Sequence, residues 1–219
     1  MRKLLLASAA VLGLAASAQA TPVISLGQVG TGNTVVGTAT GGTSTTISIT
    51  DAAVLIDELL GAVTPPAIAA FMNLTATSTD AVLTVGPALI QHYAGSFCVS
   101  SAAGCTGVVD LRGTFTDAAF GLTGGPQLSV NVANPPDALT LTSDVIPASQ
   151  LQAPSSFTVS MANLAGLAVD GTTIASFGAS FSAVASATVP EPMSIAVLGA
   201  GLVGLGVARR RRHQGGVGA

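Results

Sequence analysis

The sequence predicts an all-β protein, an antiparallel β-sandwich with a short helical insertion. Apolar and polar residues alternate in several short stretches, and clusters of Gly, Pro, Asn and Asp separate them. Alternation with a period of two is typical of half-buried strands, and short strands with regular turns are typical of sandwiches. One stretch near residues 51–72 has a helical composition instead. We expect the sandwich to occupy residues 21–188, between two apolar ends.

The first 20 residues have the three parts of a secretory signal peptide. Arg2 and Lys3 form a basic start, residues 4–16 are apolar, and small residues occupy Ala18 and Ala20 before the expected cut. Cleavage after Ala20 makes Thr21 the first mature residue. The alternative, a short buried helix, does not explain why the three parts occur in this order.

Period-two alternation marks the expected strands of the body. The turns between them contain Gly-Gly-Pro at 124–126, Asn-Pro-Pro-Asp at 134–137 and Asp-Gly at 170–171. The alternating stretches are 45–50, 81–85, 127–132, 138–142, 157–161 and 175–182.

Residues 51–60 break this pattern with the composition of a helix. Thr50 or Asp51 can cap it, and Gly61 followed by two prolines can end it. A second short helix is expected over residues 66–72, with Pro66 in its first position. We therefore predict a helical insertion packed against one sheet.

The body is acidic and contains a single cation. Residues 21–188 contain one basic residue, Arg112, and nine acidic residues, hence a net charge of −8. Such a surface repels phosphate backbones, so nucleic acid is not expected as a partner. Arg112 is expected to pair across strands with an aspartate, and a ligand carboxylate is the alternative.

Cys98 and Cys105 are the only cysteines, with six residues between them. In an exported protein a close pair of cysteines is expected to form a disulfide, here across a hairpin loop. Metal binding is the alternative, but only His92 lies near as a further ligand. We expect no metal and no cofactor.

The sequence contains no recognisable catalytic constellation. His92 has no evident partner, and no serine lies in a Gly-x-Ser-x-Gly turn. We therefore expect His92 on a solvated strand face and do not expect an enzyme. With one tyrosine and no tryptophan, the chain also lacks the aromatic platforms usual in sugar-binding sites.

The C-terminal end has the features of a membrane anchor. Residues 193–208 are 16 uncharged residues. As a helix they span roughly 24 Å at ~1.5 Å per residue, less than the ~30 Å hydrocarbon core. Snorkelling side chains and local thinning make a short transmembrane helix feasible. The basic cluster that follows acts as a stop-transfer signal held in the cytoplasm, with 213–219 as a short cytoplasmic tail. It consists of Arg209, Arg210, Arg211 and Arg212.

Residues 189–212 resemble the PEP-CTERM sorting domain. The tetrapeptide Val189, Pro190, Glu191 and Pro192, the Gly-, Ala- and Leu-rich run and the arginine cluster occur in that family's order. The resemblance implies processing by an exosortase, a membrane-embedded cysteine transpeptidase-like enzyme of Gram-negative bacteria, and a link to exopolysaccharide and biofilm. The extension 213–219 departs from the family pattern. A plain C-terminal anchor after a proline-containing linker is the alternative.

Two classes of function follow. The first is a non-enzymatic cell-surface or extracellular-matrix protein. Its precursor is held transiently in the inner membrane with the body in the periplasm, and its expected partners are an exosortase and exopolysaccharide. The alternative is a secreted hydrolase that acts on matrix polysaccharide or peptide.

Overall fold

We describe the protein from a computed structural model over residues 20–41, 44–60, 62–85, 88–121, 125–132, 134–170 and 173–188. The predicted signal peptide up to residue 19, the sorting segment 189–212 and the tail 213–219 lie outside the described residues. Within the described ranges, no helix has the length and hydropathy of a membrane span.

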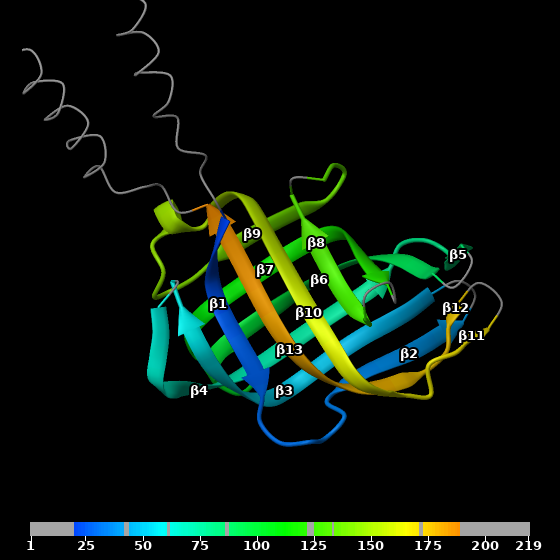
Figure 1. Ribbon diagram of the computed structural model, residues 1–219, viewed down its shortest axis with the longest axis horizontal. Helices are drawn as coiled ribbons and strands as arrows, with labels where there is room; N and C mark the ends of the chain where they lie inside the picture. The colour runs from blue at the N-terminus through cyan, green and yellow to red at the C-terminus, as the bar shows by residue number, and fades with distance from the viewer. Residues whose placement is uncertain are drawn as a thin grey trace, which may run out of the picture. The chain divides into compact units, whose positions relative to one another are not determined.

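The described chain is built from antiparallel strands (Figure 1), which confirms the all-β prediction. Its one helix is the single-turn 3₁₀ element η1 (Ala148–Gln150). The strands are β1 (Ala20–Gln28), β2 (Val35–Gly41), β3 (Ser44–Leu59), β4 (Ala62–Ser78), β5 (Leu83–Val85), β6 (Ala88–Ala102), β7 (Thr106–Gly121), β8 (Gln127–Asn131), β9 (Ala138–Thr142), β10 (Gln152–Ala165), β11 (Val169–Asp170), β12 (Thr173–Ile174) and β13 (Phe177–Thr188).

The strands close into a barrel, so the predicted sandwich is wrong. From β3 the order runs through β4, β6, β7, β8 and β10 to β13, and β1 then pairs with both β13 and β3. Two positions are shared, because β2 also lies between β3 and β13, and β9 pairs with β7 beside β8. The result is eight strand positions around one core. Sandwich and barrel strands alternate in the same way, so alternation alone could not separate the two folds.

The predicted helical insertion at 51–72 is also wrong, because these residues form the hairpin of β3 and β4. Ala52, Val54 and Ile56 are buried in the core, and the residues between them are exposed. Hydrogen bonds to β1 on one side and β4 on the other outweigh the helical composition, which is a weak preference. The two prolines at 65 and 66 lie in the irregular part of β4, between the pairs Ile56–Ile68 and Glu58–Val63.

Inward-facing side chains fill the barrel, and phenylalanine rings pack against glycines. Phe97 of β6 stacks on Phe157 of β10, with ring centroids 3.7 Å apart and planes 8° from parallel, although β6 and β10 are not neighbours. A Cβ atom on Gly113, the β7 partner of Phe97, would lie 2.4 Å from the Phe97 ring. The glycine therefore provides the space in which the stack forms.

We expect Phe97→Ala to lower the free energy of unfolding by about 3–5 kcal/mol, because it removes the stack and leaves a cavity over Gly113. Urea unfolding followed by fluorescence of Tyr93, the chain's only tyrosine, measures the loss. Phe71→Ala is the control, since Phe71 is only half-buried and lies between two inward-facing residues. Equal losses for the two variants would contradict the proposed role of the stack.

Candidate functional site

The predicted processing points flank the two strands that close the barrel. Ala20 and Thr21, at the expected signal-peptide cut, begin β1, whereas Ala18 and the sorting residues 189–192 lie outside the described residues. Ala20 pairs with Thr188, the last residue of β13, and the two strand ends lie side by side in Figure 1. The body therefore begins and ends at the same end of the barrel.

The two cysteines lie at disulfide distance on the outside of the barrel. Their sulfur atoms face each other and their Cα atoms are 6.0 Å apart. Cys98 lies between the core residues Phe97 and Val99 of β6, so its side chain points outward, and Cys105 lies in the turn to β7. Gly104 and Cys105 both have positive φ, 70° and 57°, which turns the chain sharply at this loop.

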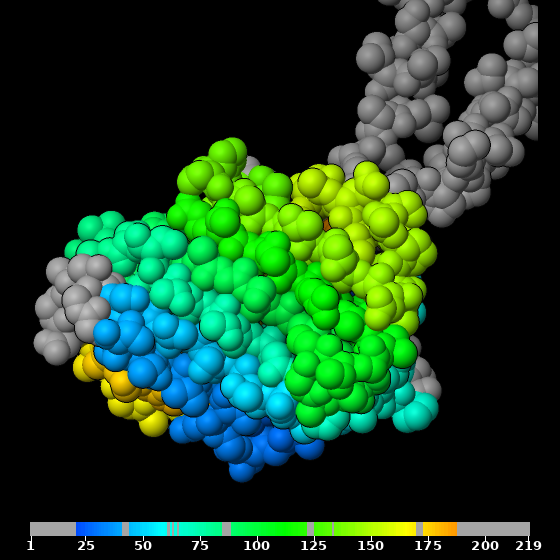
Figure 2. Space-filling model, turned by 180° about the vertical axis from the view of Figure 1, so that it is seen from behind, coloured from blue at the N-terminus to red at the C-terminus, as the bar shows by residue number. Residues whose placement is uncertain are grey.

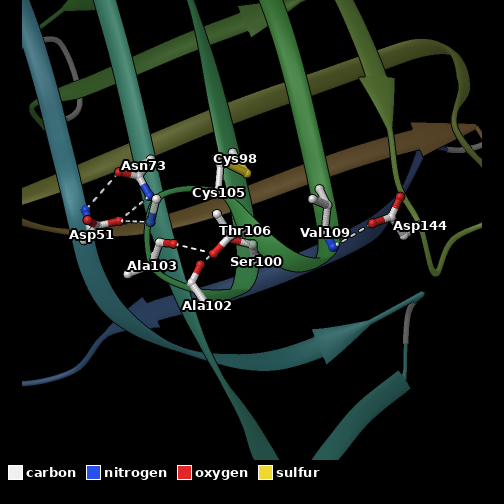
Figure 3. Close-up of a disulfide and its surroundings, with 11 residues drawn as sticks. Asp51, Asn73, Cys98, Ser100, Ala102, Ala103, Cys105, Thr106, Val109 and Asp144 are labelled. Carbon is white, nitrogen blue, oxygen red and sulfur yellow. Dashed lines mark hydrogen bonds between the residues drawn. A yellow bond between two sulfur atoms is a disulfide. The ribbon is translucent and has the colours of Figure 1, made fainter.

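Asp51 ties the cysteine loop to two neighbouring strands (Figure 3). Its Oδ1 atom accepts hydrogen bonds from the Gly104 N–H at 2.5 Å and from the Asn73 side-chain amide at 2.9 Å. The Asp51 N–H in turn donates to Oδ1 of Asn73 at 3.0 Å. The Gly104 hydrogen bond, followed by that of Asn73, lowers the pKa of Asp51. Thr50 or Asp51 was predicted to cap a helix, and instead Asp51 lies in β3 with a φ of 47°, where the pairing register with β4 shifts between Ile49 and Ala52.

A groove of about 320 Å³ lies beside the cysteine pair, over β4, β6 and β7. Figure 2 shows the barrel from the side on which these strands follow one another in cyan and green. Two cross-strand rows form its walls. In one row Asn73 pairs with Cys98 and Cys98 with Arg112, and in the next Thr75, Ser96 and Thr114 are aligned. The groove is therefore lined by an amide, hydroxyls and one guanidinium together with Leu74, Phe97 and the cysteine pair, and most of its lining is apolar.

The predicted ion pair of Arg112 is absent from the described structure. Its cross-strand neighbours are Cys98 on β6 and Thr142 on β9, neither of which is acidic. Among the described residues the one ion pair joins His92 and Asp80. Arg112 is exposed, and nothing in the local sequence shows which residues the barrel register places opposite it.

His92 does have an oriented partner, which the sequence did not reveal. The Nδ1 atom of the His92 ring lies 2.5 Å from Oδ2 of Asp80, and the backbone N–H of His92 donates a hydrogen bond to Oδ1 of Asp80 at 2.9 Å. The Asp80 carbonyl oxygen accepts a hydrogen bond from the buried Gln91 side chain, which in turn accepts one from the Tyr93 hydroxyl. The hydrogen bond to Asp80 raises the pKa of His92, and burial raises that of Tyr93. The pair fixes the segment between β4 and β5 against β6.

An aspartate–histidine pair is part of a hydrolytic triad, but a nucleophile must complete it. The Thr79 hydroxyl donates a hydrogen bond to the His92 carbonyl oxygen, but no described serine, threonine or cysteine side chain forms a hydrogen bond with the His92 imidazole. The described residues also contain no group of three or more His, Cys, Asp or Glu placed to hold a metal ion. What the described polar groups provide is hydrogen bonding and one accessible positive charge.

We expect the stability of the protein to fall as the pH rises past neutrality. The pKa of His92 is raised from 6.5 on folding, so its contribution is complete below that value and is lost as the pH rises through the folded pKa. His92→Gln should remove this component. Urea midpoints from about pH 5.5 to about pH 9 for both proteins test it, with the difference between the two curves as the readout. Parallel curves would exclude the His92–Asp80 pair as the source.

We expect Cys98 and Cys105 to be joined in the exported protein. Changing both to Ala should then lower the free energy of unfolding by roughly 2–3 kcal/mol, because the unfolded chain regains the conformational entropy that the closed loop had removed. Reduced wild-type protein serves as the control and should unfold like the double variant. Two free thiols in unreduced, denatured protein from the periplasm would contradict the bond.

A comparison of the chain with protein-family models finds no matching family, and comparisons with curated proteins and with solved structures find no match.

Proposed function

We propose that this chain is an exported cell-surface or extracellular-matrix protein of a Gram-negative bacterium, sorted through a PEP-CTERM segment at residues 189–212. The observation that carries the proposal is the order of the sequence features. A signal peptide comes first, and a Pro-Glu-Pro triplet, an apolar run and an arginine cluster follow the body in turn. Each feature is weak alone, but the ordered set is specific to an exosortase substrate.

The register of the closing strands supports this proposal. Cleavage after Ala20 removes one residue from the end of β1, and a cut near Pro190 falls beyond Thr188, the end of β13. Neither event removes a residue of the core, since the first and last core residues are Val23 and Ala187. A folded barrel can therefore keep its closure after both ends have been trimmed.

The proposed order of events follows from membrane physics. The signal peptide carries the chain across the inner membrane, and residues 193–208 then stop transfer with Arg209 to Arg212 inside. Pro190 and Pro192 disfavour helix and central strand, so the triplet stays extended and accessible outside the membrane. An exosortase then cuts at or near the triplet and releases the barrel to the surface or to an exopolysaccharide matrix.

We expect Glu191→Ala to leave the apolar anchor intact and to stop processing, so that full-length protein accumulates in the inner membrane. Mass spectrometry of the surface or secreted form, in a strain that carries an exosortase, reads the mature C-terminus. Glu58→Ala, which removes an acidic residue from the body, is the matched control and should be processed normally. A mature chain that still extends through Arg212 would show that residues 189–212 are only an anchor.

A secreted hydrolase is the second candidate, and the oriented His92–Asp80 pair is the observation in its favour. The surface-protein proposal remains the stronger one, because no described hydroxyl or thiol forms a hydrogen bond with the His92 imidazole, as the nucleophile of a triad would.

A further inference from the structure

Arg112 is a single positive charge in an acidic body, and it is left without a partner. It is the one basic residue of the described chain, and it forms no ion pair with any described carboxylate. The nearest acidic residue along the strand is Asp110, which alternation places on the same face. Burial and the neighbouring Asp144 raise the pKa of Asp110, whereas pairing with a guanidinium would lower it. Arg112 is therefore available to an anion from outside.

Arg112 lies in an open groove rather than at an isolated surface position, and hydroxyls lie beside it on a lining that is otherwise mostly apolar. The groove is about 320 Å³, which is within the range of small-ligand sites. The hydroxyls of Thr75, Ser96 and Thr114 occupy the row next to Arg112, one from each of β4, β6 and β7. None of these three side chains forms a hydrogen bond with another described residue. Each hydroxyl can both donate and accept.

One wall of the groove is held in a fixed position. Cys98 and Cys105 line it, and the hydrogen bonds of Asp51 to Gly104 and Asn73 fix the loop that carries Cys105. Asn73 lines the groove as well, with its amide already bound to Asp51. The site therefore exists before a ligand arrives, which reduces the entropy lost on binding.

We infer that this groove binds a carboxylate-bearing carbohydrate, with a uronic acid residue at Arg112. A guanidinium binds a carboxylate through two parallel hydrogen bonds, and the adjacent hydroxyls match the hydroxyls of the sugar ring. A singly charged group suits one guanidinium in a body of net charge −8, which repels a doubly charged phosphate more strongly. The chain contains no tryptophan, and its only tyrosine is buried. The sugar ring therefore has no exposed tyrosine or tryptophan to stack on. Binding therefore depends on the carboxylate. This assignment does not depend on how the protein is exported.

The test uses methyl galacturonoside, a single uronic acid residue with one carboxylate, and its methyl ester, which has the same shape but no charge, in calorimetric titrations of the full-length protein. We expect the acid to bind and the ester not to bind up to roughly 10 mM, with affinity that falls as salt rises. Arg112→Gln should weaken binding of the acid by about tenfold or more. Arg112→Lys keeps the charge but loses the pair of parallel hydrogen bonds, so its affinity for the acid should lie between those of the wild-type protein and Arg112→Gln. Unchanged circular dichroism and urea midpoints show that these exposed changes leave the fold intact.

Thr114→Val and acetate test the carbohydrate part of the inference. Thr114→Val removes one hydroxyl at constant shape and should weaken methyl galacturonoside binding several-fold while leaving any acetate binding unchanged. Acetate, which has a carboxylate but no hydroxyls, should bind much more weakly than methyl galacturonoside. The inference is overturned if wild-type protein does not bind methyl galacturonoside, if the ester or acetate binds equally well, or if Arg112→Gln binds like wild type.

Discussion

The pairing of the first strand with the last is the constraint on which this fold depends. Strands β3 to β13 form a meander in which successive strands are mostly neighbours, and β1 joins its two edges by pairing with β3 and β13. The contact between Ile24 and Ala185 links positions far apart in the chain, so its loop-closure entropy is high. In a chain that crosses a membrane from its N-terminus, this closure can form only after β13 has emerged. Eight positions then give an interior that side chains can fill, as the Phe97–Phe157 stack illustrates.

The polar groups of interest lie where the regular ladder is interrupted. Asp51 and Cys105 both have positive φ, and each redirects the chain at the end of a paired segment. The Asp51 carboxylate accepts a hydrogen bond from the loop between β6 and β7. That loop in turn places Cys105 beside Cys98 on the outer face of the barrel. Cys105, at the second of these irregularities, lines the groove beside Arg112.

The sequence was informative where alternation was clean and misleading where composition competed with it. Residues 127–131 and 157–161 are strands as predicted. Residues 51–59 were misread because alanine, leucine and glutamate favour helices, although Ala52, Val54 and Ile56 also have a period of two. Closure into a barrel could not be predicted from the sequence, because it depends on which strands pair with one another and not on the pattern within any one strand. For the same reason the His92–Asp80 pair and the absence of an acid opposite Arg112 were out of reach, because both depend on register and loop path.

The meeting of Ala20 and Thr188 at neighbouring ends of paired strands also bears on how such a chain can be rearranged. A barrel whose termini are in contact has no intrinsic starting point, because its hydrogen-bond ladder is the same wherever the covalent chain is opened. A circular permutant joined between these two residues and opened in a surface turn would keep the same strand neighbours and the same core. The packing of the barrel and its ladder of hydrogen bonds therefore do not by themselves require the chain to be opened between β1 and β13.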